Sequence, residues 1–539
     1  MGRLLDAPST RRTPSHRKPP NYGFRRLVAL LVVVSVGLLV WRSGVVGSLL
    51  GSSDEPKGNP SAPGGTTSGT SPAGRPSSTT PTQPSPSPDQ AGVATPGPIN
   101  TVIPGITTFR GNATRSWYGQ GPLPTDPKVL WRYPTSGGMC AQSNNEGVVK
   151  VWCGTGWTGQ PNVIERKDGK VEIRFGAYDD HYHFLNGETG VPLRDDLVTG
   201  DLAKGSASSD PDGYPLYYGG SRDNDLRIVA LDRGQPTVLW KLNANSAPNP
   251  VWNDDWDGAP LVVGDYLLEG GENSWFYVIK LNRGYDAEGK VRVNPKIVMN
   301  VPGYDDQLFH DLGGGTYGND VSIESSVAFR DGVAYFVNSG GLVQGWDISD
   351  VLAGGSKYER VFRYWDGDDT DATVVIDEDG YLYVGRHGER STARDREVGD
   401  LIKLDPRKKN HPVVWSVHVA SGSDVGGGIW STPALYDGVV YVTTNYGEVY
   451  AVDQETGKVL WTIKLPGPTW MSPVPIDQQL LIGDCDGVLH NYDISDPSRK
   501  PAQLWSVRLE GCIESTPAVW QGMIWVGTRG GPMYGIGDA

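Results

Sequence analysis

The 539-residue chain lacks several features that mark common protein classes. Its four cysteines are too few for a small domain built on disulfides. It also lacks an excess of positive charge, because the formal net charge is −14, and this excludes a general nucleic-acid binder with a basic face. The 72 Gly and 41 Pro make up about a fifth of the chain and argue against an all-helical bundle. By contrast, 18 Trp indicate a β-rich, repetitive architecture.

Common catalytic motifs are absent as well. The sequence contains no H-E-x-x-H, no G-x-S-x-G and no G-x-x-x-x-G-K-[ST]. These patterns supply the zinc ligands, the nucleophile and the phosphate loop of the usual metalloproteases, hydrolases and nucleotide-binding proteins. The sequence therefore gives no support to those classes.

Charge and hydropathy divide the first hundred residues into three segments. Residues 1–26 carry a net charge of +6 and predict a basic cytoplasmic tail. Residues 27–50 are mostly apolar and predict a single transmembrane signal-anchor, so that the rest of the chain lies outside. A cleaved signal peptide is the alternative, although bulky Val40 and Trp41 follow the run where small residues are needed. Residues 51–100, rich in Ser, Thr, Pro and Gly, predict a disordered linker.

Two short patterns recur after residue 101, and their recurrence predicts the fold. One is a strand that ends in Asp or Asn, as at Asp453, and the other is a strand with a large residue at one place, as at Trp461. Each occurs eight times, and the links Asp437-Gly438, Asp331-Gly332 and Asp379-Gly380 predict tight hairpin turns. This predicts an all-β fold over 101–539, an eight-bladed β-propeller of four-stranded blades, with a seven-bladed ring as the alternative.

The ends of the repeat predict how the ring closes. The last three strands finish at Asp538 without a fourth, and an isolated fourth-type strand, Lys128 to Tyr133, precedes the first blade. We expect this strand to complete the eighth blade, which removes the exposed edges of an open array.

The repeat resembles a known family. The pattern Ala451-x-Asp453-x-x-Thr456-Gly457-Lys458-x-x-Trp461 is similar to the PQQ-like repeat of quinoprotein-type propellers, and Ala230, Asp232 and Trp240 keep its spacing. Phe109-Arg110-Gly111-Asn112, followed by Lys128-Val129-Leu130-Trp131, is also similar to the start of such propellers. The family includes pyrroloquinoline quinone (PQQ) dehydrogenases and the non-catalytic outer-membrane assembly lipoprotein of Gram-negative bacteria. The chain is closest in character to the latter.

For the dehydrogenases, the resemblance implies a quinone held near the propeller axis with calcium, a stacking Trp and often a disulfide between adjacent cysteines. This sequence has no Cys-Cys pair and no C-x-x-C-H motif for haem. We therefore expect no cofactor, with PQQ and calcium as the alternative.

The four cysteines favour a structural role. In an oxidising exterior the economical pairing is two local bridges, Cys140 with Cys153 and Cys485 with Cys512. Metal ligation is the alternative, although no C-x-x-C pair occurs.

The position three residues before the proline of each first strand, such as Pro433, indicates a candidate site. In the resembled fold the first strand of each blade is innermost, so this column would circle one mouth of the central channel. The column is Met139, Gly205, Asp257, Glu324, Asp371, Trp430, Trp470 and Glu514. The acids could hold a cation and the indoles could stack on a ligand, which makes Asp257, Glu324, Asp371, Glu514, Trp430 and Trp470 ligand-binding candidates. Turn capping and packing between blades is the simpler interpretation.

Two further groups are candidates for metal ligation. Asp366, Asp368 and Asp371 partly resemble a calcium loop, and acidic pairs such as Asp254-Asp255 and Asp305-Asp306 fall in loops expected at the same mouth. His181 and His183 would share one strand face beside Asp179, although no third zinc ligand is evident.

The sequence thus leaves two hypotheses from different classes. The favoured one is a membrane-anchored, extracytoplasmic binding or scaffold propeller with no catalytic residues, whose acidic mouth holds an envelope protein or cell-wall component. The other is a quinoprotein-like oxidoreductase in which Asp257, Glu324 and Asp371 include the calcium ligands and general base, and Trp430 or Trp470 stacks on the quinone.

Overall fold

The computed structural model describes residues 102–145, 148–156, 159–314, 318–420 and 426–539. The predicted tail (1–26), signal-anchor (27–50) and linker (51–100) lie outside these ranges. Among the described residues, no helix combines the length and the apolar character that a membrane span requires.

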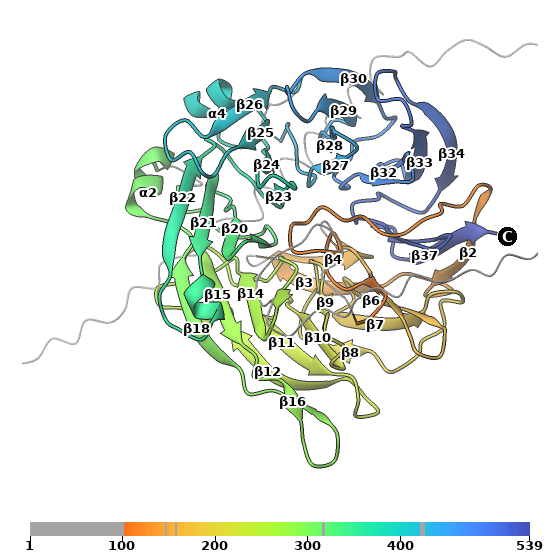
Figure 1. The fold of residues 1–539 in the computed structure, drawn as a ribbon. Helices are drawn as coiled ribbons and strands as arrows, with labels where there is room; N and C mark the ends of the chain where they lie inside the picture. Colours follow the sequence, from red (N-terminus) through yellow and green to blue (C-terminus); the bar gives the residue numbers. More distant parts are fainter. Residues whose placement is uncertain (1–101, 146–147, 157–158, 315–317, 421–425) are drawn as a thin grey trace, which may run out of the picture. The chain divides into compact units, whose positions relative to one another are not determined.

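Eight antiparallel sheets follow one another around a ring, which confirms the predicted eight-bladed propeller (Figure 1). Blade 1 comprises β5 (Asn162–Glu165), β6 (Val171–Gly176), β7 (His181–Asn186) and β8 (Leu197–Val198), and blade 2 comprises β9 (Ser208–Ser209), β10 (Leu216–Gly219), β11 (Asp225–Ala230) and β12 (Thr237–Asn243). Blade 3 comprises β13 (Leu261–Val263), β14 (Tyr266–Gly270), β15 (Trp275–Lys280) and β18 (Lys296–Pro302), and blade 4 comprises β19 (Ala328–Arg330), β20 (Val333–Phe336), β21 (Leu342–Asp347) and β22 (Glu359–Trp365). Blade 5 comprises β23 (Val375–Ile376), β24 (Leu382–Gly385), β25 (Leu401–Leu404) and β26 (Val413–Val417), and blade 6 comprises β27 (Ala434–Tyr436), β28 (Val439–Thr443), β29 (Glu448–Asp453) and β30 (Val459–Lys464). Blade 7 comprises β31 (Val474–Ile476), β32 (Gln479–Gly483), β33 (Val488–Asp493) and β34 (Ala502–Arg508), and blade 8 comprises β35 (Ala518–Trp520), β36 (Met523–Gly527), β37 (Met533–Asp538) and β2 (Pro127–Tyr133).

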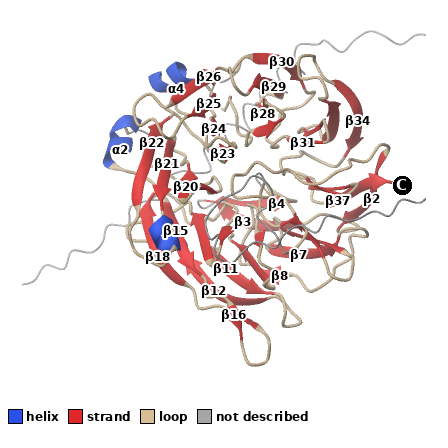
Figure 2. Ribbon diagram, in the orientation of Figure 1, coloured by secondary structure: helices blue, strands red, loops and turns tan. Residues whose placement is uncertain are grey.

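Little else is regular, and strands dominate the described residues (Figure 2). The remaining elements are β1 (Gly105–Ile106), β3 (Cys140–Asn145), β4 (Val148–Cys153), β16 (Gly284–Tyr285), β17 (Val291–Arg292), η1 (Ala244–Ser246), α2 (Asp306–Leu312), α3 (Ser349–Leu352) and α4 (Ala393–Val398). β1 pairs with β5 and gives blade 1 a fifth strand, while β3 and β4 form a separate two-stranded sheet.

The predicted tight turns form where the sequence places them, with one exception. Between β27 and β28, Asp437 and Gly438 both have positive φ, as the primed hairpin turn requires. Asp331 and Gly332 do the same between β19 and β20. The link through Asp379 is longer, because β23 ends at Ile376 and the Asp377 side chain accepts bonds from the Asp379 and Tyr381 amides instead.

At two places the large residue of an outer strand joins one blade to the next. Trp415 of β26 donates its indole N–H to the Gln454 carbonyl of blade 6 and lies against Gly457, where a Cβ would meet the ring at 2.7 Å. Trp131 of β2 does the same to blade 1, donating to the Gly187 carbonyl. The Thr-Gly turn of the repeat is therefore a docking place for the preceding blade's indole.

The ring closes as predicted. β2 pairs with β37 in antiparallel register, with Val129 opposite Ile536 and Tyr133 opposite Met533. In Figure 1 the orange β2 lies beside the dark blue β37 next to the C-terminus. The two ends of the repeat thus share blade 8, and β37 has a strand partner on both sides.

The segment after β1 crosses the centre of the ring, which the sequence patterns did not predict. It bonds to the innermost strands of five blades, through Thr107 to Ser209, Ala113 to Phe329, Thr114 to Ile376, Tyr118 to Leu435 and Gln120 to Val519. Residues 107–115 and Tyr118 are buried, including the guanidinium groups of Arg110 and Arg115. Residues 107–120, here called the channel floor, therefore fill the inside of the ring.

Both predicted disulfides are present, and they take up all four cysteines. Cys485 and Cys512 join blade 7 to the loop that leads into blade 8. Cys140 and Cys153 join β3 to β4, and this hairpin precedes blade 1 instead of lying within it.

Candidate functional site

Seven of the eight column residues lie where the sequence predicts them, in the loops that lead into the innermost strands. Six of them precede the strand by four residues, as Trp430 precedes β27. Met139 is an error, because the innermost regular blade-1 strand is β5 and Met139 lies ahead of the separate β3–β4 hairpin. The remaining seven, here called the mouth column, are Gly205, Asp257, Glu324, Asp371, Trp430, Trp470 and Glu514.

The carboxylates of the mouth column are buried. Asp257 is 1 % exposed, Glu324 4 %, and Asp371 and Glu514 each 8 %. They therefore need partners, since an unpaired buried carboxylate costs several kcal/mol or shifts its pKa.

Lys204 supplies such a partner at blades 2 and 3. Its ammonium lies 2.7 Å from Asp257, 2.9 Å from Asp255 and 2.9 Å from Glu272. Arg222 adds a second cation 3.0 Å from Asp255. Sequence reasoning missed Lys204, although it directly precedes column residue Gly205.

The charges in this cluster are strongly shifted. Burial raises the pKa of Asp257 well above its ordinary value, with the charge of Glu272 adding to the effect and Lys204 opposing it. Burial also disfavours ionised Glu272, but Lys204 and hydrogen bonds outweigh this and lower its pKa to about 2. The cluster thus holds its own cation, and Asp257 is a poor candidate for a calcium ligand.

A chain of hydroxyl groups links the mouth column across blades 4 and 5. Ser322 Oγ lies 3.1 Å from a Glu324 carboxylate oxygen and 2.9 Å from Ser339 Oγ. Ser339 Oγ donates to Asp371 Oδ1 at 3.0 Å. Glu324 and Asp371 are therefore brought together as predicted, with serines between them.

The two predicted indoles also come together. The Trp430 and Trp470 rings stack at 5.5 Å with an interplanar angle of 19°, and His387 packs on Trp430 at 4.5 Å. Both indoles are half-buried. This aromatic stack spans blades 5 to 7 and is the least buried part of the mouth column.

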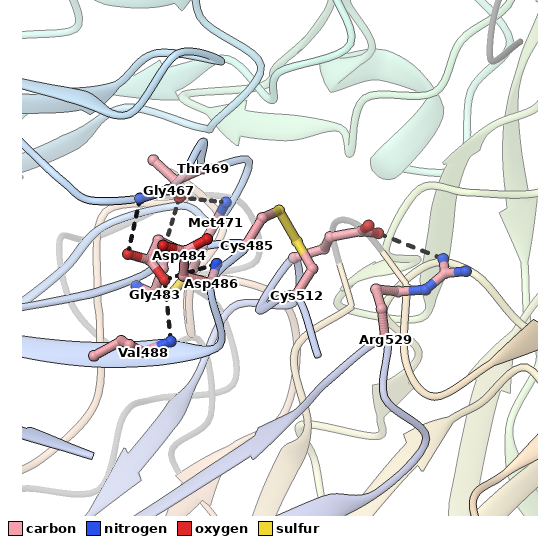
Figure 3. The surroundings of a disulfide bond; sticks show 11 residues. Gly467, Thr469, Met471, Gly483, Asp484, Cys485, Asp486, Val488, Cys512 and Arg529 are labelled. Carbon is pink, nitrogen blue, oxygen red and sulfur yellow. Dashed lines mark hydrogen bonds and ion pairs between the residues drawn. A yellow bond between two sulfur atoms is a disulfide. The ribbon is translucent and has the colours of Figure 1, made fainter. Parts of the chain in front are cut away.

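Glu514 completes the mouth at blade 8. It lies 3.5 Å from the Arg529 guanidinium, which also covers the rings of Tyr178 and Trp152. Figure 3 shows Arg529 beside the Cys485–Cys512 disulfide, so the bridge fixes the loop that carries Glu514.

The predicted calcium set has other partners. Asp366 accepts a bond from Thr370 Oγ1, and burial raises its pKa to about 7 despite the opposing charge of Arg386. Asp368 accepts bonds from the backbone amides of Glu389, Arg390 and Ser391. Both carboxylates hold loops in place, while Asp371 faces a different group that includes Asp369 and His387.

The other acidic pairs do not all reach the mouth. Asp305 caps α2 by accepting from the Leu308 amide, and it pairs with Arg360 and Arg363 of β22. Since β22 is the outermost strand of blade 4, the expected place of Asp305 at the mouth is wrong.

His183 is held by carboxylates on both sides. Its ring nitrogens lie 3.1 Å from Asp179 and 3.1 Å from Asp196, and His181 stacks on it. Burial would lower the pKa of His183, but hydrogen bonds and charge from the two aspartates raise it to about 9.

This shift predicts a loss of stability at alkaline pH. Because the folded pKa exceeds the ordinary 6.5, the contribution is complete below about pH 6.5 and is lost as pH rises through about 9. The shift corresponds to on the order of 3 kcal/mol. Urea unfolding at pH 6 and pH 9.5 checks it: His183→Gln is expected to flatten the difference, and an unchanged pH dependence in this variant would refute the assignment.

Comparison with known proteins agrees with this architecture. A family model described as outer membrane protein assembly factor BamB matches residues 399–500. A europium-containing methanol dehydrogenase is 14 % identical, with 80 % of this chain and 98 % of that chain covered at a TM-score of 0.54. The quinohemoprotein alcohol dehydrogenase of Comamonas testosteroni is 12 % identical, with 81 % of each chain covered at a TM-score of 0.52.

The chain is a β-propeller of PQQ-like repeats. At these identities the solved structures establish its fold and no more. No curated protein matches the chain at a significant level.

The mouth of this PQQ-like propeller is chemically divided. Blades 2 to 5 contribute buried acids with Lys204, Arg222 and hydroxyl partners, whereas blades 6 and 7 contribute the two indoles. The channel floor closes the ring beneath these residues.

Proposed function

We propose that this PQQ-like propeller is a membrane-anchored, extracytoplasmic binding or scaffold protein of the cell envelope. Its channel mouth is the binding site, and its partner is an envelope protein or a cell-wall component. The N-terminal segment 27–50 tethers it, and the linker 51–100 gives it reach.

The main support for this proposal is the cation that the mouth already contains, the Lys204 ammonium. A quinoprotein of this fold would use Asp257 with Glu324 and Asp371 to hold calcium beside the quinone. Here the Lys204 ammonium already lies among these acids, 2.7 Å from Asp257, where a bound cation would lie. One face of Trp430 packs on His387, and the ring also stacks on Trp470, which leaves little room for a quinone between the indoles. The residues present therefore fit PQQ with calcium poorly.

Two further features support a binding role outside the cytoplasm. The two disulfides suit an oxidising compartment, where such bridges persist. The match to the BamB model in blades 5 to 7 includes Trp430 and Trp470, and that description names an assembly factor.

Photo-cross-linking tests the proposal. We expect the photoreactive residue p-benzoylphenylalanine in place of Trp470 to form a discrete covalent adduct in intact host cells, because this half-buried ring borders the mouth. The matched control places the same residue at Leu504, which is 50 % exposed on the outermost strand of blade 7. Adducts are read by mobility shift and mass spectrometry.

The comparison of the two positions decides whether the channel mouth is the binding site. An adduct at position 470 that is missing at position 504 supports the site. No adduct at 470, or the same adduct at both positions, contradicts it.

A further inference from the structure

Three potential metal ligands meet at the mouth beside blade 5, and only one of them, Asp371, belongs to the predicted calcium set. One ligand atom from each of Asp369, Asp371 and His387 lies within 4.8 Å of the other two. All three residues are buried, and the His387 side chain is only 4 % exposed.

The backbone fixes this arrangement. Asp369 and His387 form a β-bridge, in which the His387 amide donates to the Asp369 carbonyl at 3.0 Å, and His387 forms a second bridge to Gly428. Asp371 is oriented by Ser339 Oγ, and the His387 ring is held by Trp430. The backbone bridges, Ser339 and Trp430 therefore fix the positions of the three ligand residues.

His387 differs from the other buried histidines that face aspartates. His183 and His490 lie 3.1 Å from their carboxylate partners, at hydrogen-bond distance. His387 Nε2 faces two carboxylates at 3.5 Å and 3.9 Å and has a hydrogen bond to neither. A buried imidazole that points at two carboxylates without bonding to them needs another explanation.

These separations suit a shared metal ion. A tetrahedral ion with bonds of about 2.1 Å holds its ligands roughly 3.4 Å apart, close to the observed 3.5 Å and 3.9 Å. An imidazole among the ligands favours zinc and similar ions, whereas calcium and magnesium select all-oxygen sets. Three protein ligands also leave a fourth position for an outside group.

Further acidic residues near the cluster also favour a bound cation. Asp320 and Glu389 approach Asp369 from a second side, within 4.8 Å. The Arg390 guanidinium lies 3.8 Å from Asp320 and 3.7 Å from Asp368.

We propose that Asp369, Asp371 and His387 bind one zinc-type divalent transition-metal ion. The inference deepens the proposed function and rests on it, because the open fourth position would let the ion take a donor group from whatever the mouth binds.

The test is equilibrium dialysis of the full chain, without a polyhistidine tag, against Zn²⁺ after chelator treatment. We expect close to one Zn²⁺ per chain, retained in excess Ca²⁺, and an affinity at least about tenfold lower for His387→Gln. His490→Gln removes a buried histidine elsewhere and is expected to bind as wild type. Asp371→Asn gives a second test of the ligand set if His387→Gln fails to fold.

Two results overturn the proposal: wild-type chain with no Zn²⁺ above the dialysis buffer, or unchanged affinity in the folded ligand variant. Zinc binding is read without any partner, and the cross-link from position 470 is read without zinc. Failure of one experiment is therefore distinguishable from failure of the other.

Discussion

Replacing Lys204 with Met is expected to lower the free energy of unfolding by about 3–5 kcal/mol. The substitution leaves Asp255, Asp257 and Glu272 buried together without the ammonium that now lies within 2.9 Å of each. Arg222 lies 3.0 Å from Asp255. Urea unfolding at pH 7 measures the change.

The matched control is Lys241→Met. Lys241 is about half exposed and pairs with Asp225 at 2.9 Å, so its loss should cost no more than about 1 kcal/mol. Because the three acids can group around a cation, we also expect added Ca²⁺ to raise the stability of the Lys204 variant but not of wild type. Equal effects of the two lysine variants would show that the cluster does not depend on Lys204.

Replacing Arg115 with Met is expected to cost a similar amount, about 3–5 kcal/mol, because it opens the channel floor. The guanidinium donates to the carbonyls of Phe109, Ala259 and Val327 at 2.8, 3.1 and 2.9 Å, and so ties the floor to blades 3 and 4. Each buried carbonyl left without a donor costs about 1–3 kcal/mol.

Geometry makes this effect specific to arginine. A lysine has a single ammonium and cannot span these acceptors, so Arg115→Lys is expected to rescue little. Arg499→Met is the control, since Arg499 is 75 % exposed and pairs only locally with Asp496. A thermal midpoint of Arg115→Met within a degree of wild type would show that the floor does not hold the blades.

Much of the fold could be predicted because it depends on the spacing of residues close together in the sequence. The Asp-Gly turns, the Trp at the outer strand and the Thr-Gly turn repeat at fixed distances, and each has a local physical role, as the Trp415 contact with Gly457 shows. The ring closure followed from counting strands. The mouth column could be predicted for the same reason, since each member precedes an innermost strand.

The partners of the mouth column could not be predicted, because contacts across blades have no local signature. Lys204 and Glu272 are far apart in sequence, and nothing in their surroundings distinguishes them from surface charges. His387 follows β24 with no motif, and the channel floor depends on bonds to five blades. The predicted place of Asp305 at the mouth was wrong because an acidic pair is equally typical of a helix cap and of a binding loop.

The most direct test of the account is a titration of the full chain with PQQ, with and without Ca²⁺, followed by tryptophan fluorescence. If the mouth is a binding site whose acids are already paired and whose indoles stack on each other, no saturable, calcium-dependent quenching is expected. Saturable quenching that requires Ca²⁺ and is lost in Trp470→Phe would contradict the account and identify the propeller as a quinoprotein.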